Sequence, residues 1–197
     1  MTQTRYETAT WDEVYAMLVS QAQKIRKACF KPDVIVAVSR GGWIPARTHS
    51  DLLENPNIVT VRTECYVGTC KAKPAPALTQ QLSECIIGKR VLIVDDIADS
   101  GRSLKLVKEH VIQKGAAEVE VATLFRKPWS IVKPDYWERE TELWVVFPWD
   151  LKETVRNEFE NRGATSISQL SSRLVDAGLP CDLVNSFLEE MAGDPPC

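Results

Sequence analysis

Two hydrophobic patterns alternate along the first 125 residues of the chain. Apolar residues recur at intervals of three and four between residues 10 and 28, as in a helix with one buried face. Thr10 and Glu13 have capping-box spacing at the start of this run, and Lys31-Pro32-Asp33 ends it. Residues 34–38 then form a continuous and mainly β-branched run. Such a run predicts a strand that is buried on both faces.

The alternation of helix-like and strand-like segments continues toward residue 150. The same patterns predict helices at 44–53 and 104–115, and strands at 57–66, 91–94, 119–125, 136–137 and 143–147. Residues 67–88 have no clean period, so we predict a mobile loop, and 127–134 should be an irregular connection. Strands that alternate with helices indicate an α/β fold with a mainly parallel twisted sheet flanked by helices.

The composition changes after Asp150. Two short amphipathic helices are predicted at 166–177 and 181–192. Their apolar faces would consist of Ile167, Leu170, Leu174, Leu183, Val184, Phe187 and Leu188. We therefore divide the chain into a main domain, 1–150, and a C-terminal helical extension, 151–197. The extension is too short to be identified as an independent domain.

Composition narrows the classes of protein and of partner. The 197 residues are 44% hydrophobic and 26% charged, as in folded soluble proteins, and the net charge of -3 argues against a nucleic-acid-coating surface. The six cysteines form no CxxC motif and there are only two histidines, which disfavours zinc. No signal pattern and no apolar run of roughly 20 residues is present. We expect a cytoplasmic protein with reduced thiols and no membrane partner.

Three acids follow the predicted strand at 91–94. They are Asp95, Asp96 and Asp99. Because an unpaired buried carboxylate is unfavourable, something must solvate or neutralise the adjacent pair. A hard cation such as Mg²⁺ and the hydroxyl groups of a ligand are the two candidates.

The residues after these acids are suited to an anion. Residues 99–103, DSGRS, lie between the strand and the next helix, where backbone N–H groups favour phosphate. Gly101 permits close approach of the backbone, and Ser100 and Ser103 supply hydroxyls. A diol held by the acids together with a phosphate held by this loop describes a ribose 5-phosphate. The alternative is a turn that merely caps the helix through Asp99 or Ser100.

Two segments resemble a known family. VLIVDDIADSGRSL resembles the phosphoribosyl-pyrophosphate signature of the type I phosphoribosyltransferases, and VAVSRGGWIPA resembles their pyrophosphate loop. The resemblance implies the fold of that family, with a flexible hood loop after Tyr66 that closes over the site. Family members often have Ser-Tyr where this chain has Cys65-Tyr66, which puts the role of that serine in doubt.

The resemblance also implies a role for each residue of the two motifs. Asp99 would be the general base, and Asp96 would lie closest to a Mg²⁺ cofactor. Phosphoribosyl pyrophosphate would be bound by Arg40, Gly41, Gly42, Asp95, Asp96, Asp99, Ser100, Gly101, Arg102 and Ser103.

Residues 125–150 resemble the corresponding part of the 6-oxopurine phosphoribosyltransferases. By that resemblance Lys127 would donate to O6 and N7 of the purine, and Trp144 would stack on the ring. Val145 would present backbone groups, and Asp150 would lie near the 2-substituent or a second metal. A planar base needs an aromatic platform and a 6-oxo group needs a donor, which agrees with these residue types. The alternatives are a core tryptophan at 144 and a solvated surface lysine at 127.

The implied activity is transfer of ribose 5-phosphate from phosphoribosyl pyrophosphate to N9 of hypoxanthine, guanine or xanthine, with release of pyrophosphate. The sequence leaves open which base is preferred. The partners would be these two substrates and no nucleic acid, and we expect a homodimer or higher homo-oligomer. Two alternatives stay open: a non-catalytic sensor of phosphoribosyl pyrophosphate or a nucleotide, with the extension as its output module, and an enzyme of the same fold that acts on adenine or a pyrimidine.

Overall fold

The structure, a computed structural model, describes residues 5–66 and 75–193. It consists of two compact units. Val14–Glu142 forms the first, here called the sheet unit. The chain up to Glu13 and from Leu143 onward forms the second, here called the helical unit. No helix in the described ranges is long and apolar enough to cross a membrane.

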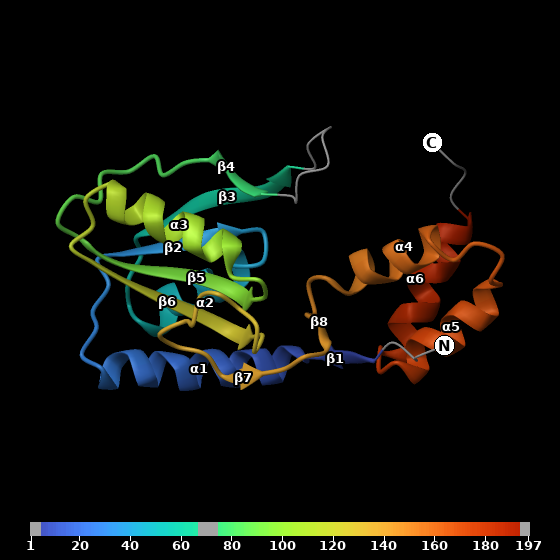
Figure 1. The fold of residues 1–197 in the computed structure, drawn as a ribbon. Coiled ribbons are helices and arrows are strands. Elements are labelled where there is room, and N and C mark those ends of the chain that lie inside the picture. The colour runs from blue at the N-terminus through green and yellow to red at the C-terminus, as the bar shows by residue number, and fades with distance from the viewer. Residues whose placement is uncertain (1–4, 67–74, 194–197) are drawn as a thin grey trace. The chain divides into compact units, whose positions relative to one another are not determined.

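A six-stranded sheet forms the centre of the sheet unit (Figure 1). Its strands, in spatial order, are β4 (Ala75–Gln80), β3 (Ile58–Tyr66), β2 (Val34–Ser39), β5 (Arg90–Ala98), β6 (Glu118–Arg126) and β7 (Arg139–Glu140). All neighbouring pairs are parallel except β3 and β4. The predicted α/β fold with a mainly parallel sheet is therefore confirmed.

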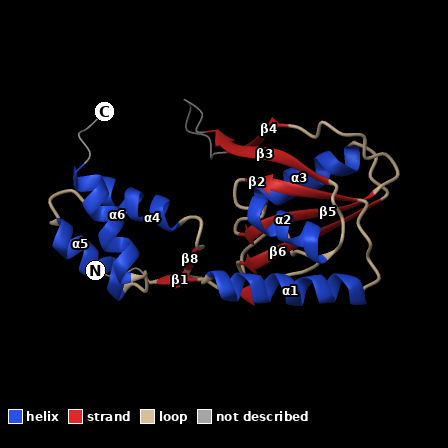
Figure 2. Ribbon diagram, turned by 180° about the vertical axis from the view of Figure 1, so that it is seen from behind, coloured by secondary structure: helices blue, strands red, loops and turns tan. Residues whose placement is uncertain are grey.

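Helices cover both faces of this sheet (Figures 1 and 2). The helices are α1 (Trp11–Lys27), α2 (Trp43–Leu52) and α3 (Arg102–Gln113). Side chains of α3 pack with Val34, Val36 and Val38 on one face, whereas Ile25 of α1 and Ala46 of α2 pack with Ile35 and Ala37 on the other. Every residue of β2 is buried, because this strand lies in the middle of the sheet with a helical layer on each side.

The predicted capping box begins α1. The backbone N–H of Thr10 donates to Oε2 of Glu13 at 2.9 Å, and the backbone N–H of Glu13 donates to Oγ1 of Thr10 at 3.2 Å. These two bonds satisfy donors that the first turn of a helix leaves open. The predicted apolar stripe of the helix, Val14, Met17, Leu18, Ala22 and Ile25, is buried.

Three local predictions were wrong. Residues 75–80 form strand β4 instead of a loop, while residues 67–74 lie outside the described residues. This strand contains Pro76, which an edge strand tolerates, and its only large apolar residue is Leu78, so its pattern is weak. The strand expected at 136–137 is a single bridge between Tyr136 and Ala122, and the strand lies at 139–140. Strand β5 continues through Ala98, past the predicted end at 94.

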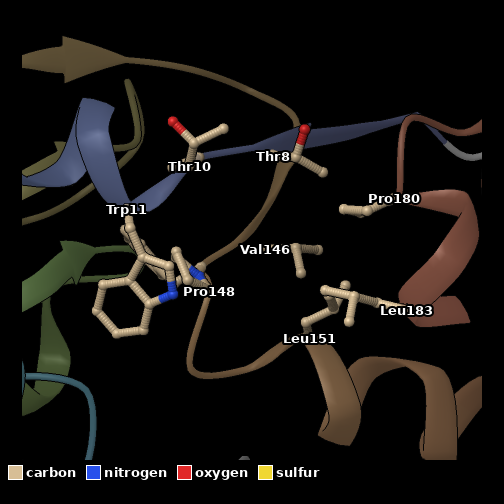
Figure 3. A pocket seen from close by; sticks show the side chains of 10 residues that line it. Thr8, Thr10, Trp11, Val146, Pro148, Leu151, Pro180 and Leu183 are labelled. Carbon is tan, nitrogen blue, oxygen red and sulfur yellow. The ribbon is translucent and has the colours of Figure 1, made fainter. Parts of the chain in front are cut away.

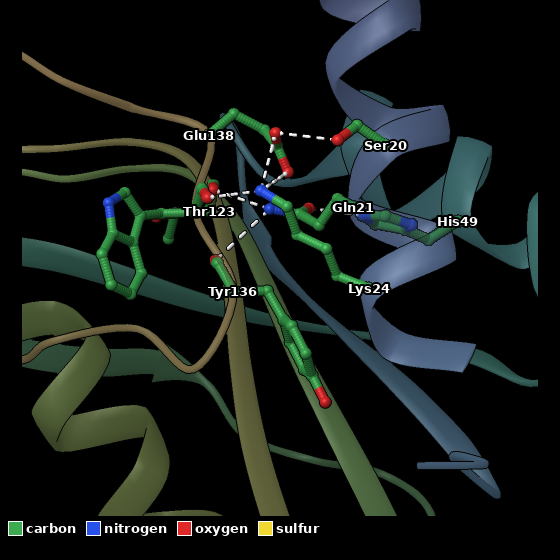
Figure 4. A network of polar contacts seen from close by, with 8 residues as sticks. Ser20, Gln21, Lys24, His49, Thr123, Tyr136 and Glu138 are labelled. Carbon is green, nitrogen blue, oxygen red and sulfur yellow. Dashed lines mark hydrogen bonds and ion pairs between the residues drawn. The ribbon is translucent and has the colours of Figure 1, made fainter. Parts of the chain in front are cut away.

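A buried polar network joins α1 and α2 to strand β6 (Figure 4). The side-chain amide of Gln21 donates to the carbonyl oxygens of Thr123 at 2.9 Å and Tyr136 at 3.3 Å. Its oxygen lies 2.7 Å from Nε2 of His49, so Nε2 carries the donated proton. Burial lowers the pKa of His49 to about 4, and its Nδ1 has no hydrogen-bond partner among the described residues. The imidazole is therefore neutral at pH 7.

The helical unit combines a short sheet with three helices. Strands β1 (Tyr6–Thr8) and β8 (Trp144–Val146) pair in parallel, and β8 lies within the strand predicted at 143–147. The helices are α4 (Leu151–Glu160), α5 (Ile167–Asp176) and α6 (Cys181–Gly193). Helix α4 was not predicted, because only Leu151 and Val155 are buried in an otherwise polar segment.

The two predicted tail helices are confirmed as α5 and α6, but their apolar faces are narrower than predicted. Leu170, Leu174, Val184 and Leu188 are buried, whereas Ile167 and Leu183 are exposed. Leu183 lines an apolar pocket of about 230 Å³ within this unit (Figure 3). The side chains around the pocket include Trp11, Val146, Pro148, Leu151 and Pro180. The predicted domain boundary at residue 150 stays a prediction, because compact units need not be independent domains.

Candidate functional site

The two loops with candidate binding residues follow neighbouring strands. Strands β2 and β5 pair in parallel, so both loops lie at the same edge of the sheet. A β-carbon at Gly41 would lie 2.2 Å from Oδ2 of Asp96, and one at Gly42 would lie 2.3 Å from the carbonyl oxygen of Val94. The first loop therefore packs directly on the acidic end of β5, and this contact leaves space only for glycine at both positions.

The loop between β2 and α2 is a tight turn. The peptide bond between Ser39 and Arg40 is cis, and the backbone N–H of Gly42 donates to the carbonyl oxygen of Val38 at 2.8 Å. The backbone N–H of Trp43 donates to the carbonyl oxygen of Arg40 at 3.1 Å. Ser39 is buried and Arg40 is exposed. The turn thus presents a cationic side chain at the ligand-facing edge of the sheet.

We expect Gly41→Ala to weaken binding of phosphoribosyl pyrophosphate, the ligand that the family resemblance implies, about 5- to 150-fold, because the new methyl group would displace the Asp96 carboxylate. Overpacking a well-filled site typically costs about 1–3 kcal/mol, and every 1.4 kcal/mol is tenfold. Isothermal titration calorimetry of the wild type and of Gly41→Ala would measure the change in affinity. Gly193→Ala is the matched control, because a β-carbon there meets no atom within 4 Å. Equal affinities in all three proteins would contradict the contact.

Asp95 and Asp96 are adjacent carboxyl groups near the end of β5. The backbone N–H of Asp96 donates to Oδ1 of Asp95 at 3.0 Å, and Asp96 is buried. Burial, together with the neighbouring Asp96 charge, raises the pKa of Asp95 well above its ordinary value. A cation or ligand hydroxyl groups at this position would stabilise the ionised pair.

The second loop, residues 99–101, connects β5 to α3 and is here called the phosphate-type loop. Gly101 is the N-cap of α3 in the left-handed conformation, with φ 75°, and no side chain caps it. The N-cap position is thus Gly101 and not Asp99 or Ser100, although Oγ of Ser100 accepts a hydrogen bond from the backbone N–H of Arg102 at 3.4 Å. A pocket of about 150 Å³ is present here. Its lining includes Asp95, Asp96, Asp99, Ser100, Gly101 and Ser103.

Lys127 follows β6 and lies beside this loop. Its backbone N–H donates to the carbonyl oxygen of Ala98 at 2.9 Å, and the residue is 5% exposed. It is therefore not a solvated surface lysine. Its Nζ lies 5.5 Å from the ring centroid of Trp129, and Nε1 of Trp129 donates to Oδ1 of Asp99 at 3.2 Å.

The sequence patterns did not identify Trp129 as a residue of this site. The indole is 53% exposed, so packing does not account for it. The available signal was its position two residues after Lys127, in a connection that contains two prolines.

The other candidate purine residues belong to the helical unit. Trp144 is 63% exposed on β8, so it is not a core tryptophan, and it borders a pocket of about 310 Å³ with Tyr6 and Thr154. Val145 is buried, and Asp150 is the N-cap of α4. The sheet unit thus brings the candidate sugar-phosphate residues and Lys127 together, while Trp144, Val145 and Asp150 lie in the other unit.

Comparisons with known proteins identify a family of similar chains. A curated relative, the xanthine-guanine phosphoribosyltransferase of Gluconobacter oxydans, is 31% identical over 149 residues, 74% of this chain and 84% of its own length. The crystal structure of a purine phosphoribosyltransferase from Pyrococcus horikoshii is 39% identical, with a TM-score of 0.67 over 73% of this chain and 93% of that one.

A second similar structure shares the fold along nearly the whole chain. It is a hypothetical protein from Neisseria gonorrhoeae with bound ppGpp, 23% identical, with a TM-score of 0.69 over 96% of this chain and 99% of that one.

Residues 10–155 match the model of the phosphoribosyl transferase domain. This match spans both candidate loops and most of the chain. The protein therefore belongs to the phosphoribosyl transferase domain family.

Proposed function

We propose that this protein is a Mg²⁺-dependent purine-salvage enzyme that transfers ribose 5-phosphate from phosphoribosyl pyrophosphate to N9 of a 6-oxopurine. The observation that carries the proposal is the junction of the two loops, where Gly41 packs against Asp96 and the loop with Asp99 contacts the segment with Lys127. The names of the relatives, xanthine-guanine and hypoxanthine-guanine phosphoribosyltransferase, support the class of base.

The sugar phosphate would occupy the pocket at the end of β5. We assign the ribose hydroxyls to Asp95 and Asp96, because carboxylates accept the hydrogen bonds that a diol donates. The 5-phosphate would bind Ser100, Gly101, Arg102 and Ser103 at the start of α3, where backbone N–H groups and the helix dipole favour an anion. Pyrophosphate would bind the turn with Arg40, Gly41 and Gly42.

The residues at this edge also fit a magnesium ion. The described residues contain no cluster of three or more His, Cys, Asp or Glu side chains suited to a metal. Mg²⁺, however, is commonly held by one or two carboxylates together with substrate phosphates. Asp96 is the carboxylate that we assign to it, beside Asp95. When bound, the ion would offset the negative charge of the departing pyrophosphate.

By the family resemblance, we assign purine recognition to Lys127, Trp144, Val145 and Asp150. The Lys127 ammonium would donate to O6 and N7, which suits a 6-oxopurine and not adenine, since the 6-amino group of adenine is a donor. We assign ring stacking to Trp144, backbone contacts to Val145 and the surroundings of the 2-substituent to Asp150. These four assignments rest on the family resemblance together with the burial of Lys127 and the exposure of Trp144.

The reaction would be a displacement at C1 of the ribose. N9 of the purine forms the new bond as the bond to pyrophosphate breaks, and Asp99 takes the proton from N7. Positive charge develops on the sugar in the transition state, where the carboxylates of Asp95 and Asp96 stabilise it. Exclusion of water from the site would limit hydrolysis of the activated sugar.

The direct test is nucleotide synthesis by the purified protein. It would be incubated with Mg²⁺, phosphoribosyl pyrophosphate and, in separate reactions, hypoxanthine, guanine, xanthine, adenine or uracil. Product from one or more 6-oxopurines supports the proposal and identifies the preferred base. Product from adenine or uracil alone would exclude it. No product, with phosphoribosyl pyrophosphate still bound, would favour the sensor alternative, which the names of the relatives do not support.

Removal of divalent metal should abolish turnover. We expect excess EDTA to lower product formation to background, and added Mg²⁺ to restore it, because the charge on the leaving pyrophosphate would otherwise go uncompensated. A parallel sample that receives EDTA already saturated with Mg²⁺ controls for the chelator itself. Full activity in metal-free buffer would remove magnesium from the proposal.

Trp144→Ala should raise the KM of the purine about 5- to 150-fold, since stacking of a base on an aromatic side chain is worth about 1–3 kcal/mol. The KM of phosphoribosyl pyrophosphate should change little. Steady-state kinetics with each substrate varied in turn would separate the two constants. Trp11→Ala serves as the control, because Trp11 is also exposed, at 55%, but has no assigned role. An unchanged purine KM would place the platform elsewhere.

We also expect the protein to work in the cytoplasm as a homodimer or higher homo-oligomer. These two expectations rest on the composition and the resemblance. Light scattering coupled to size-exclusion chromatography would measure the number of subunits.

A further inference from the structure

The connection after β6 folds back along the loop that follows β5. The backbone N–H of Lys127 donates to the carbonyl oxygen of Ala98 at 2.9 Å, and the backbone N–H of Ile131 donates to the carbonyl oxygen of Ser100 at 3.2 Å. Asp99 lies between the two acceptors and Trp129 lies midway between the two donors. The backbone thus brings Trp129 and Asp99 opposite one another.

Further contacts hold this connection in place. The backbone N–H of Ser130 donates to the carbonyl oxygen of Lys127 at 3.1 Å, and Oγ of Ser130 donates to the carbonyl oxygen of Val132 at 2.9 Å. A β-carbon at Gly101 would lie 2.6 Å from Oγ of Ser130. The turn that carries Trp129 is therefore packed against the phosphate-type loop, although the indole itself is half exposed.

The Trp129 side chain contacts two groups of the proposed site. Its Nε1 donates to Oδ1 of Asp99 at 3.2 Å, and Nζ of Lys127 lies 5.5 Å from its ring centroid. A cation at that distance is attracted to the face of an indole. One side chain thus touches both the candidate general base and the candidate purine-binding lysine.

We propose that Trp129 is a positioning residue for Asp99. An indole N–H donates and cannot accept a hydrogen bond, so Trp129 can hold Oδ1 of the carboxylate without competing for the proton of the purine. The second oxygen, Oδ2, then takes that proton from N7. The indole ring would hold the Lys127 ammonium beside the purine, so that the ammonium can donate to O6 and N7. This inference rests on the proposed function, because it assigns Trp129 to that reaction.

The first experiment compares Trp129→Phe with Trp137→Phe. Phenylalanine keeps a ring for Lys127 but removes the N–H that holds Asp99. The Trp137 ring faces Arg126 and Lys133, so its replacement is a matched control in the same part of the chain. We expect kcat of Trp129→Phe to fall about tenfold, while the KM of phosphoribosyl pyrophosphate stays within about twofold, as for a misplaced catalytic group.

A double-mutant cycle tests whether Trp129 acts through Asp99. With Asp99→Asn no base is left to position, so adding Trp129→Phe should change kcat by less than about twofold. A tenfold loss in both backgrounds would overturn the inference, because Trp129 would then act independently of Asp99. An unchanged kcat in the single variant would overturn it as well.

Indole NMR provides a readout that needs no turnover. The Trp129 resonance is identified by its loss in Trp129→Phe, and Asp99→Ala should shift it upfield because the acceptor is gone. An unchanged resonance would overturn the inference even if the wild-type enzyme is active. Absence of product from every base in the wild-type protein would overturn the proposed function, and the positioning role with it, whatever the NMR result.

Discussion

Asp99→Asn should lower kcat about 10²- to 10⁴-fold, the usual contribution of a positioned general base. Asparagine has nearly the same shape as aspartate, and its side-chain oxygen can still accept the hydrogen bond from Nε1 of Trp129. The amide cannot take the N7 proton at neutral pH. Binding of phosphoribosyl pyrophosphate should therefore change little. Steady-state kinetics and titration calorimetry on the same preparation would measure both quantities.

The control for this substitution is Asp51→Asn, which removes an exposed carboxylate from α2. Its kcat should equal that of the wild type. Near-normal turnover of Asp99→Asn would remove Asp99 from the mechanism. A loss of sugar-phosphate binding as large as the loss of kcat would instead assign Asp99 to the ligand.

Acidification from pH 6.5 to pH 4 should remove about 3 kcal/mol of folding stability through His49 alone. Its pKa is about 4 in the folded protein, against 6.5 for an ordinary histidine, because the imidazole is buried. Below pH 6.5 the unfolded chain binds a proton that the folded chain does not. The stability is therefore complete above pH 6.5 and is lost as the pH falls toward 4, at about 1.36 kcal/mol for each pH unit.

Urea unfolding of the wild type and of His49→Gln, at several pH values between 4 and 7.5, would isolate this effect. Glutamine can still donate to Oε1 of Gln21 but does not titrate. Other titrating groups are common to both proteins and cancel in the difference of their unfolding free energies. That difference should shift by about 3 kcal/mol in favour of the variant on acidification. Parallel pH dependences would show that His49 is accessible to protons in the folded state.

The sheet and its main helices could be predicted because their burial patterns are unambiguous. Strand β2 is buried at all six positions, and its sequence is a continuous apolar run. Helix α1 has both a capping box and an apolar stripe. Strand β4 and helix α4 were missed for the opposite reason. The first is an edge strand with a proline, and only two residues of the second are buried, so tertiary contacts determine both more than local pattern does.

The adjacency of the two candidate loops could be predicted from the sequence. The two loops adjoin because they follow adjacent parallel strands, and the acids and glycines of each loop are contiguous in sequence. Trp129 could not be found in this way. Its hydrogen bond to Asp99 forms because the connection after β6 folds back along the loop that follows β5. No hydrophobic pattern in the sequence predicts this arrangement. The sequence also did not indicate that Lys127 and Trp144 belong to different compact units.

The return of the chain from Lys127 to the loop at Asp99 has a consequence for how such a site can evolve. The candidate base, the phosphate-type loop, the lysine and the indole all belong to one β-α-β unit, formed by β5, α3, β6 and the connection that follows. The turn with Gly41 and Gly42 follows the neighbouring strand β2, and Trp144, Val145 and Asp150 belong to the helical unit. Mutations within one short stretch of the gene could therefore alter the candidate general base, its tryptophan and the lysine together without changing the glycine turn after β2.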